Sequence, residues 1–350
     1  CESSAVCDAE AHVCRVDMGA GASYLAASDT SRGDDQLAWL AGELESFWLL
    51  AIRCSLLSRD APQTWSALLC LEHHGATRPP ALQAIVAHAA ARLAHALEAG
   101  ASVRLEPETC AALFGALLTN AFGIRHAGER ARRLDVRPAA LAVSPAASLF
   151  NHSCCDANSS TDHRLTGSDN ALTFRAARRI SVGEAVCICY TACEEPTYVR
   201  QRELKRAKHF ECACAKCRDP LEGDTFGGCF RCPGCARGWQ LMGAVGGGWA
   251  CGVCRATTPH GEIVQWDEQM RAGLASILEA ADGMVHQTGR RLSRWIDEAL
   301  KRCHPNHAMV LQARLALVAF AEHEEADASA AGLRAKLAAA DEALTHAARL

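Results

Sequence analysis

Apolar residues recur every three to four positions over residues 36–124, which is the spacing of helices that bury one face. The clearest stretch lies between Pro80 and Gly100, where the proline suits a helix start and the glycine a helix end. Its apolar positions share one face: Leu82, Ile85, Val86, Ala89, Leu93, Ala96 and Leu97. Residues 39–48 and 110–122 show the same spacing. We therefore expect three helices in this part of the chain.

The spacing changes to every second residue at residues 171–174 and 185–190, which predicts two short strands. One face of the second strand would carry Val186, Ile188 and Tyr190. Gly183 precedes this strand and suits a turn. Tyr190 would then end the strand, where a side chain can project into a cleft.

Helical spacing returns over residues 265–350. One apolar stripe follows Pro305 and consists of Leu311, Leu315 and Val318. The preceding residues 223–261 are dense in glycine and contain paired cysteines. Because this segment has too few apolar residues to fold by itself, we expect a bound metal to stabilise it.

The composition is that of a globular protein, because 49% of the 350 residues are hydrophobic and the formal net charge is −4. No run approaches the roughly 18 uncharged apolar residues of a membrane span, so we expect no membrane partner. The acidic balance argues against nucleic acid as the main partner. The basic run over residues 200–208 contains a glutamate and no aromatic stripe, so we interpret it as a solvated helix face.

Thirteen of the twenty cysteines lie between Cys154 and Cys254, many of them in CxC and CxxC pairs. Such pairs suit tetrahedral zinc, whereas disulfide partners in small secreted domains are spread along the sequence. We therefore expect zinc sites in a reducing compartment, that is, the cytoplasm, the nucleus or both. Two CxxC pairs separated by fifteen residues form one predicted site: Cys232, Cys235, Cys251 and Cys254. Cys229 has the same spacing to Cys232, so a shifted pair is an alternative.

Three motifs follow one another along the chain: Phe150-Asn151-His152-Ser153-Cys154, then GEAVCICY at residues 183–190, then Cys212-x-Cys214-x-x-Cys217. In this order they resemble the C-terminal half of a SET domain with its cysteine-rich post-SET tail. The resemblance is greatest to the SET-and-MYND lysine methyltransferases. Three clustered thiolates leave the fourth corner of a tetrahedral zinc site open. The resemblance implies that Cys154 fills that corner, and the adjacent Cys155 is the alternative ligand.

The resemblance implies an α+β fold with a SET-domain β-core and an all-α C-terminal domain similar to tetratricopeptide repeats. The expected division is a MYND remnant or linker at 1–35, a helical SET insertion at 36–124, the SET core at 125–210, a post-SET zinc segment at 211–220, a zinc ribbon at 221–262 and the helical domain at 263–350. We expect the helical domain to bind partner proteins.

The activity that the resemblance implies is S-adenosylmethionine-dependent methylation of a lysine on a histone or another protein. Tyr190 would orient the substrate lysine and the methyl group. The residues expected at the cofactor are Asn120, Ser148, Asn151, His152 and Phe210. Taken singly, Tyr190 would instead be interpreted as a buried strand tyrosine with a satisfied hydroxyl.

The chain departs from the family pattern in three places. The loop after Cys154 lacks the usual proline, which affects the choice of ligand between Cys154 and Cys155. Lys208 stands where the family often has an aromatic residue beside the cofactor or lysine channel. The N-terminal Gly-x-Gly strand and a complete MYND module are not evident, and the chain begins with Cys1, so we expect upstream sequence to be missing. The candidates for a MYND remnant are Cys1, Cys7, His12 and Cys14, and the alternative is a cofactor-binding glycine pair, Gly19 and Gly21.

Two other functions compete with the enzyme. The first is a non-catalytic zinc-dependent scaffold, in which an incomplete SET domain supports a helical tail that recruits partners. The second is a nucleic-acid-binding zinc ribbon, which would require a salt-dependent affinity that the acidic balance gives no reason to expect. An intact Gly-x-Gly strand in the upstream sequence would favour the enzyme over the scaffold.

Overall fold

The computed structural model describes residues 12–15, 35–124, 140–162, 172–243, 248–280 and 285–321. Helices form two separate groups, and short strands lie between them in the sequence. None of the helices described is both long and apolar enough to cross a bilayer.

The first helical group contains α1 (Asp35–Asp60), α2 (Pro62–Leu69), α3 (Pro80–Ala101) and α4 (Pro107–Asn120), with the 3-10 turn η1 (Gly75–Thr77) before α3. Proline opens three of these helices, where its missing N–H removes no helical hydrogen bond. The helices meet in an apolar core whose fully buried members include Leu50, Leu68, Leu93, Phe114 and Leu117. The three predicted helices are confirmed, and α2 is an additional one.

A three-stranded antiparallel sheet packs against this group, in the order β1 (His12–Arg15), β3 (Ala140–Val143), β2 (Phe122–Ile124). Alternate residues of β3 serve two cores, since Leu141 and Val143 join the helical core while Ala140 and Ala142 pack with Ile124. The sequence analysis did not predict β3, because its four residues are all apolar and show no alternation.

Strand β1 lies in the segment interpreted as a MYND remnant or linker, and that interpretation did not predict a strand there. His12 and Cys14 belong to β1, where they pair with Val143 and Leu141 of β3. The other candidates at the N-terminus, namely Cys1, Cys7, Gly19 and Gly21, lie outside the described residues.

Two pairs of very short strands follow. β4 (Asn151–His152) pairs in parallel with β7 (Cys187–Ile188), and β5 (Ser159–Asp162) pairs with β6 (Thr173–Ala176) in antiparallel fashion. The strand predicted over residues 185–190 is therefore reduced to two residues, and Val186 is exposed rather than buried beside Ile188. The predicted turn is present, since Gly183 has a φ of +82°.

Asn158 explains why β7 is so short. Its buried side-chain amide donates to the Ala185 carbonyl (2.8 Å) and to Glu184 Oε1 (3.1 Å), and its oxygen accepts from the backbone N–H of Cys187 (2.9 Å). At Glu184 and Ala185, just before β7, these side-chain bonds take the place of strand pairing. The loop that departs from the family pattern thus holds this segment in place.

Among the described residues up to 321, the remaining elements are α5 (Thr197–Lys208), α6 (Ala215–Arg218), the ribbon and three helices after it. The ribbon strands β8 (Phe230–Arg231), β9 (Trp239–Met242), β10 (Trp249–Cys251) and β11 (Thr257–Thr258) form one antiparallel sheet. The helices are α7 (His260–Glu279), α8 (Val285–Ala299) and α9 (Ala308–Ala321).

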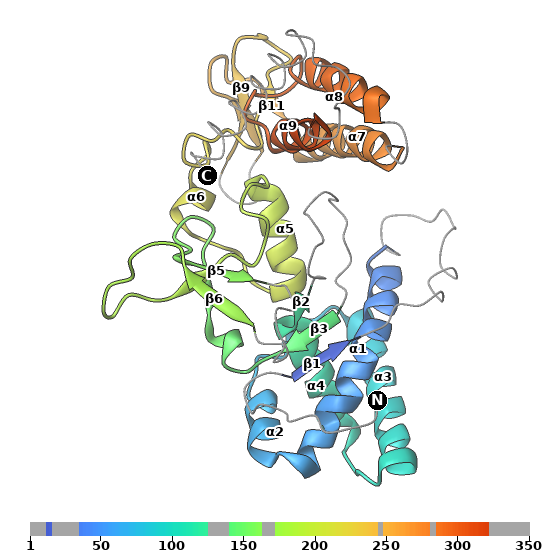
Figure 1. Ribbon diagram of the computed structural model, residues 1–350. Coiled ribbons are helices and arrows are strands. Elements are labelled where there is room, and N and C mark those ends of the chain that lie inside the picture. Colours follow the sequence, from blue (N-terminus) through green and yellow to red (C-terminus); the bar gives the residue numbers. More distant parts are fainter. Residues whose placement is uncertain are drawn as a thin grey trace.

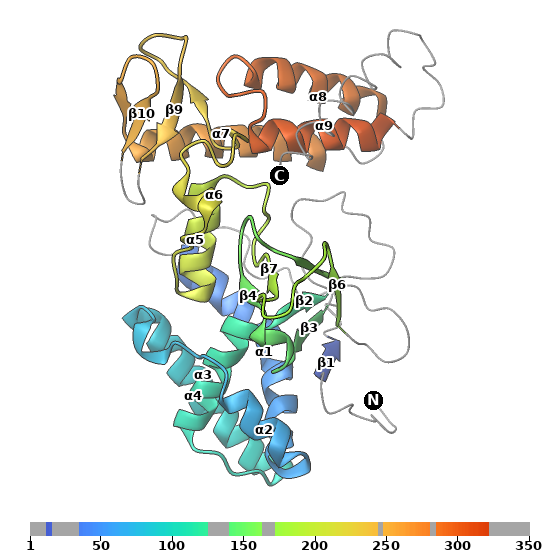
Figure 2. The same ribbon diagram turned by 90° about the vertical axis from the view of Figure 1, so that its left-hand side faces the viewer.

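One apolar core joins α5, the ribbon and the C-terminal helices. It contains Tyr198 of α5, Phe230 and Trp249 of the ribbon, and Ile263 and Leu274 of α7. The ribbon and the C-terminal helices, predicted as separate domains, therefore share a core. Figures 1 and 2 show α1–α4 at one end of the molecule, α7–α9 with the ribbon at the other, and α5 between them.

The basic run at residues 200–208 forms α5, but it is not a uniformly solvated face. Arg202, Lys205 and Arg206 are exposed, whereas Arg200 and Leu204 are fully buried. The four-residue spacing of Arg200 and Leu204 puts both on the side of the helix that faces the protein.

Candidate active site and metal centres

A cleft of about 360 Å³ lies where the end of α4, the 3-10 turn η2 (Ala147–Leu149), the end of β7 and the end of α5 meet. Four of the six residues predicted for catalysis or cofactor binding line it: Asn120, Ser148, Tyr190 and Phe210. The lining also includes Glu72, Thr119, Phe122, Phe150, Cys189 and Lys208. This volume lies in the range of small-molecule sites, about 300–1,000 Å³.

Tyr190 follows β7 and is half-buried in the cleft wall. Its hydroxyl donates a hydrogen bond to the carbonyl of Phe150, and its backbone N–H donates to Nδ1 of His152 at 3.0 Å. Burial raises the pKa of the Tyr190 hydroxyl above its ordinary value, so the residue stays neutral at physiological pH. Both ends of Tyr190 are therefore fixed by residues of the NHSC segment.

His152 lies behind Tyr190, with ring centroids 5.2 Å apart, and it is 5.8 Å from the ring of Phe210. Because Nδ1 accepts from Tyr190, the neutral ring carries its hydrogen on Nε2, which lies 3.0 Å from Sγ of Cys154. Burial lowers the pKa of His152 to about 4, with a further contribution from the charge of Arg200. His152 thus connects the cleft wall to a cysteine cluster.

The side-chain donors of Asn120 and Ser148 are hydrogen-bonded to backbone carbonyls. The Asn120 amide donates to the carbonyls of Glu72 and Ala116, both at 2.9 Å, and the Ser148 hydroxyl donates to the Ser144 carbonyl at 2.8 Å. It is therefore their oxygen atoms that could accept a hydrogen bond from a ligand in the cleft. The sixth predicted residue, Asn151, is exposed and is not part of the cleft lining.

Lys208 brings a positive charge to the cleft. Its ammonium donates to the carbonyl of Thr119 at the end of α4 and lies 5.3 Å from the centroid of the Tyr190 ring. Burial lowers the pKa of Lys208 to about 8. The sequence marked this position as a departure from the family, but only the structure shows that the side chain faces Tyr190.

The first cysteine cluster consists of Cys154, Cys212, Cys214 and Cys217, whose sulfur atoms all lie within 4.8 Å of one another. The Cys154 sulfur is 3.9 Å from that of Cys212 and 3.6 Å from that of Cys217. Tetrahedral zinc with Zn–S bonds of about 2.3 Å separates its sulfurs by about 3.8 Å, whereas a disulfide requires about 2.05 Å. The cluster therefore fits zinc, and it includes Cys154 while the exposed Cys155 lies outside it.

The second cluster consists of Cys232, Cys235, Cys251 and Cys254, also within 4.8 Å of one another. Sulfur separations are 3.6 Å between Cys232 and Cys254 and 3.7 Å between Cys235 and Cys251. The N–H groups of Val253 and Cys254 point at the Cys251 sulfur (3.4 and 3.5 Å), as expected for a knuckle turn that stabilises a thiolate. Cys229 is buried outside this cluster, so the shifted pairing is not the one that the structure assembles.

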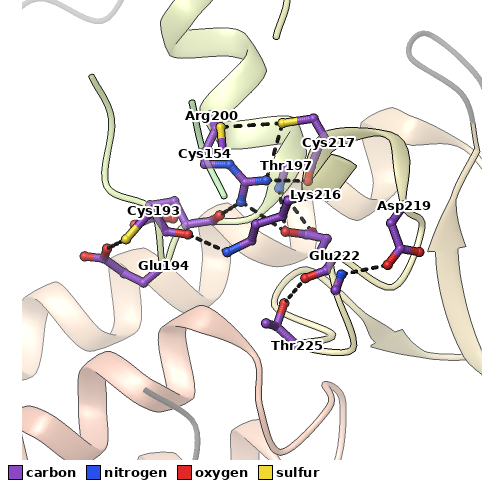
Figure 3. Close-up of polar contacts among 12 residues, drawn as sticks. Cys154, Cys193, Glu194, Thr197, Arg200, Lys216, Cys217, Asp219, Glu222 and Thr225 are labelled. Carbon is purple, nitrogen blue, oxygen red and sulfur yellow. Dashed lines mark hydrogen bonds and ion pairs between the residues drawn. The ribbon is translucent and has the colours of Figure 1, made fainter. Parts of the chain in front are cut away.

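A buried arginine supports the first cluster (Figure 3). Arg200 Nη2 donates to Sγ of Cys217 (3.6 Å) and to Oγ1 of Thr197 (2.7 Å), while Nη1 forms an ion pair with Glu222 (3.1 Å). Both Arg200 and Glu222 are nearly inaccessible to solvent. A cation beside four thiolates offsets their excess negative charge and holds the post-SET segment against α5. The sequence analysis missed this residue, and its only signal was the four-residue spacing from Leu204.

Residues 48–191 match the family model of the SET domain. The chain is similar to the SET domain-containing protein SmydA-8, isoform B, of Drosophila melanogaster, with 28% identity over 36% of this chain and 28% of the relative. It is 32% identical to the histone-lysine N-methyltransferase SMYD3 of Homo sapiens over 32% of this chain and 24% of that protein. A SET and MYND domain-containing protein of Dictyostelium discoideum is 39% identical over 22% of this chain and 19% of the relative. The matched region thus spans only 19–28% of the length of these relatives.

Proposed function

We propose that this chain, which is similar to SET-and-MYND proteins over its SET domain region, is an S-adenosylmethionine-dependent protein-lysine N-methyltransferase. The observation that carries the proposal is the cleft itself, which gathers Tyr190, Asn120, Ser148 and Phe210 from four separate segments. The chemistry of these side chains fits the cofactor, since an aromatic ring and two oxygen acceptors suit an adenosyl group and an amino group. When bound, S-adenosylmethionine would supply a methyl group on a sulfonium centre.

The aromatic lining would help to present a neutral lysine. At neutral pH a lysine with a pKa near 10.4 is deprotonated only about once in a few thousand molecules, which costs roughly 4–5 kcal/mol. Phe122, Phe150 and Tyr190 line the cleft and limit the access of water to an entering ammonium, and this desolvation lowers its pKa. Tyr190 is held by two hydrogen bonds, so its ring can align the entering amine without reorganising.

The two cysteine clusters are able to bind zinc, and we propose one structural Zn²⁺ in each. The first would hold the segment that carries Phe210 beside the NHSC segment, which also supports Tyr190. The second would stabilise the ribbon. Neither cluster lines the cleft, so a zinc ion in either one would act on structure rather than on the transferred methyl group.

Tyr190→Phe tests the proposal. Loss of the hydroxyl removes the bond to the Phe150 carbonyl, and the resulting misplacement should lower methyl transfer by about 100-fold or more. Transfer is measured with labelled S-adenosylmethionine on the proteins of a cell lysate, using the full-length protein. Tyr198→Phe is the matched control, because Tyr198 lies in the core between α5 and the ribbon, and its rate should stay near that of the wild type.

If the full-length protein labels no lysate protein and binds no S-adenosylmethionine in calorimetry, the proposed function is wrong. Binding of the cofactor without transfer to any protein would instead support the non-catalytic scaffold. We further propose that the substrate is a protein presenting a lysine and that the C-terminal helices bind partner proteins in the cytoplasm or nucleus.

A further inference from the structure

We propose that Lys208 is a methylation site within the protein's own cleft, so that the chain modifies itself. This inference rests on the proposed function, because it needs the same cleft and the same cofactor. It differs from that function in naming an intramolecular acceptor, the amine of a residue that ends α5.

The backbone directs Lys208 into the cleft. Helix α5 ends at Lys208, and His209 adopts a left-handed conformation with a φ of 59°. This turn brings Phe210 to the same cleft two residues later. Lys208 and Phe210 are therefore neighbours on the cleft wall, and the lysine amine faces the ring of Tyr190.

The anchoring of the amine leaves it able to react. The hydrogen bond to the Thr119 carbonyl uses one N–H, so a neutral amine keeps its lone pair available for attack. The amine lies 5.3 Å from the centroid of the Tyr190 ring, the ring proposed to align an incoming lysine. A lysine from another protein would have to enter the space that this side chain already borders.

The other lysines are placed differently. The whole chain has only five lysines among its 36 basic residues, and Lys336 lies outside the described residues. Lys205 and Lys301 are exposed and form ion pairs with Glu211 and Glu298. Lys216 donates to the carbonyl of Cys193 at 2.8 Å beside the first cysteine cluster. Of these four described lysines, Lys208 is the one that lines the cleft.

The protonation state of Lys208 also suits a nucleophile. Burial lowers its pKa to about 8, so about half of the amines are neutral at pH 8. A fully solvated lysine would be neutral in only about one molecule in 250 at that pH. The other ionisable side chains that line the cleft are Glu72, Cys189 and Tyr190. The amine would thus need less assistance to lose its proton than an exposed lysine needs.

In the proposed step the ammonium of Lys208 first releases a proton to solvent. The lone pair on Nζ then forms a bond to the methyl carbon of S-adenosylmethionine, and the bond between that carbon and sulfur breaks with its electron pair left on sulfur. The products are N-methylated Lys208 and S-adenosylhomocysteine. A methylated Lys208 is larger, so it would narrow the entrance for a lysine of another protein.

The first measurement uses the cofactor-free protein. Competitive acylation with acetic anhydride, read residue by residue by mass spectrometry across pH, should show Lys208 reacting with an apparent pKa near 8. Addition of S-adenosylhomocysteine should reduce its reactivity, while the exposed Lys205 stays unchanged as an internal reference. Reactivity of Lys208 that is insensitive to S-adenosylhomocysteine would place the amine away from the cofactor and overturn the proposal.

The second measurement incubates full-length protein with S-adenosylmethionine carrying a deuterated methyl group. Tandem mass spectrometry should find methylated Lys208, either already present at purification or carrying the deuterated methyl group. The rate of labelling per molecule should be independent of protein concentration, because the reaction is intramolecular. Lys208→Arg should abolish this signal and Lys205→Arg should preserve it. If lysate proteins become labelled while Lys208 never does, the inference is wrong and the proposed function stands. If neither is labelled, both are wrong.

Discussion

The two cysteine clusters have the same donors and nearly the same sulfur separations, yet they differ in what they join. In the first, Cys154 is 58 residues from Cys212 and 63 from Cys217. In the second, the two knuckles are closer, with Cys235 only 16 residues from Cys251. The first is mostly buried, whereas Cys254 of the second is exposed.

Chain entropy does not explain this difference in role. Loop-closure cost rises as about (3/2)RT ln n, so closing 63 residues rather than 22 costs only about 0.9 kcal/mol more. What separates the clusters is their surroundings. The first contacts His152, which supports Tyr190, while the second lies in a ribbon whose Phe230 and Trp249 pack on the C-terminal helices. The same set of cysteine donors can therefore support the cleft wall in one place and the ribbon in another.

The largest expected effect comes from removing one ligand of each cluster. A structural zinc in a peptide contributes on the order of 10 kcal/mol or more, which is comparable to the stability of a whole domain. Cys217→Ser and Cys251→Ser should each lower the bound zinc by one equivalent, measured by plasma mass spectrometry. Only Cys217→Ser should also abolish S-adenosylhomocysteine binding in calorimetry. Equal loss of binding in both variants would show that the two clusters are not functionally distinct.

A smaller effect is expected for Arg200→Met, which leaves Glu222 buried without its cation. Breaking one side of a buried ion pair costs about 3–5 kcal/mol, so the free energy of unfolding in urea should fall by that amount. The double variant Arg200→Met with Glu222→Leu should recover part of the loss, because neither member of the ion pair is then left buried without its partner.

Arg200→Met also tests whether the two clusters differ in how tightly they hold zinc. Arg200 donates to Cys217 of the first cluster, so Arg200→Met should release zinc from that cluster at a lower chelator concentration. Zinc in the second cluster should be retained as in the wild type. Unchanged chelator sensitivity at the first cluster would mean that Arg200 contributes to packing alone.

The smallest effect is expected for Cys155→Ser. Cys155 is exposed and outside the first cluster, so the free energy of unfolding should change by no more than about 0.5 kcal/mol and the zinc content should not change. Loss of one zinc equivalent in this variant, with none lost in Cys154→Ser, would transfer the ligand role to Cys155.

Local spacing was sufficient to predict much of this molecule. The knuckles at Cys232 and Cys251 were predictable because two ligands with two residues between them can reach one metal without help from distant parts of the chain. Helix α3 was predictable because its apolar face and its opening proline lie within one continuous segment. The order of the NHSC and GEAVCICY segments likewise indicated the placement of Tyr190, which the structure puts in the cleft wall.

Other features depended on contacts between distant segments. Cys154 and Cys155 are adjacent in a bend, so spacing alone could not choose between them, and the fold brings Cys154 rather than Cys155 into the cluster. The burial of Arg200 and the direction of Lys208 were decided by packing of α5 against the post-SET segment and the end of α4. The sequence by itself determined which short segments can form helices and knuckles, because those depend on neighbouring residues. Only the tertiary structure decided which side chains share the cleft, because that depends on how those segments pack.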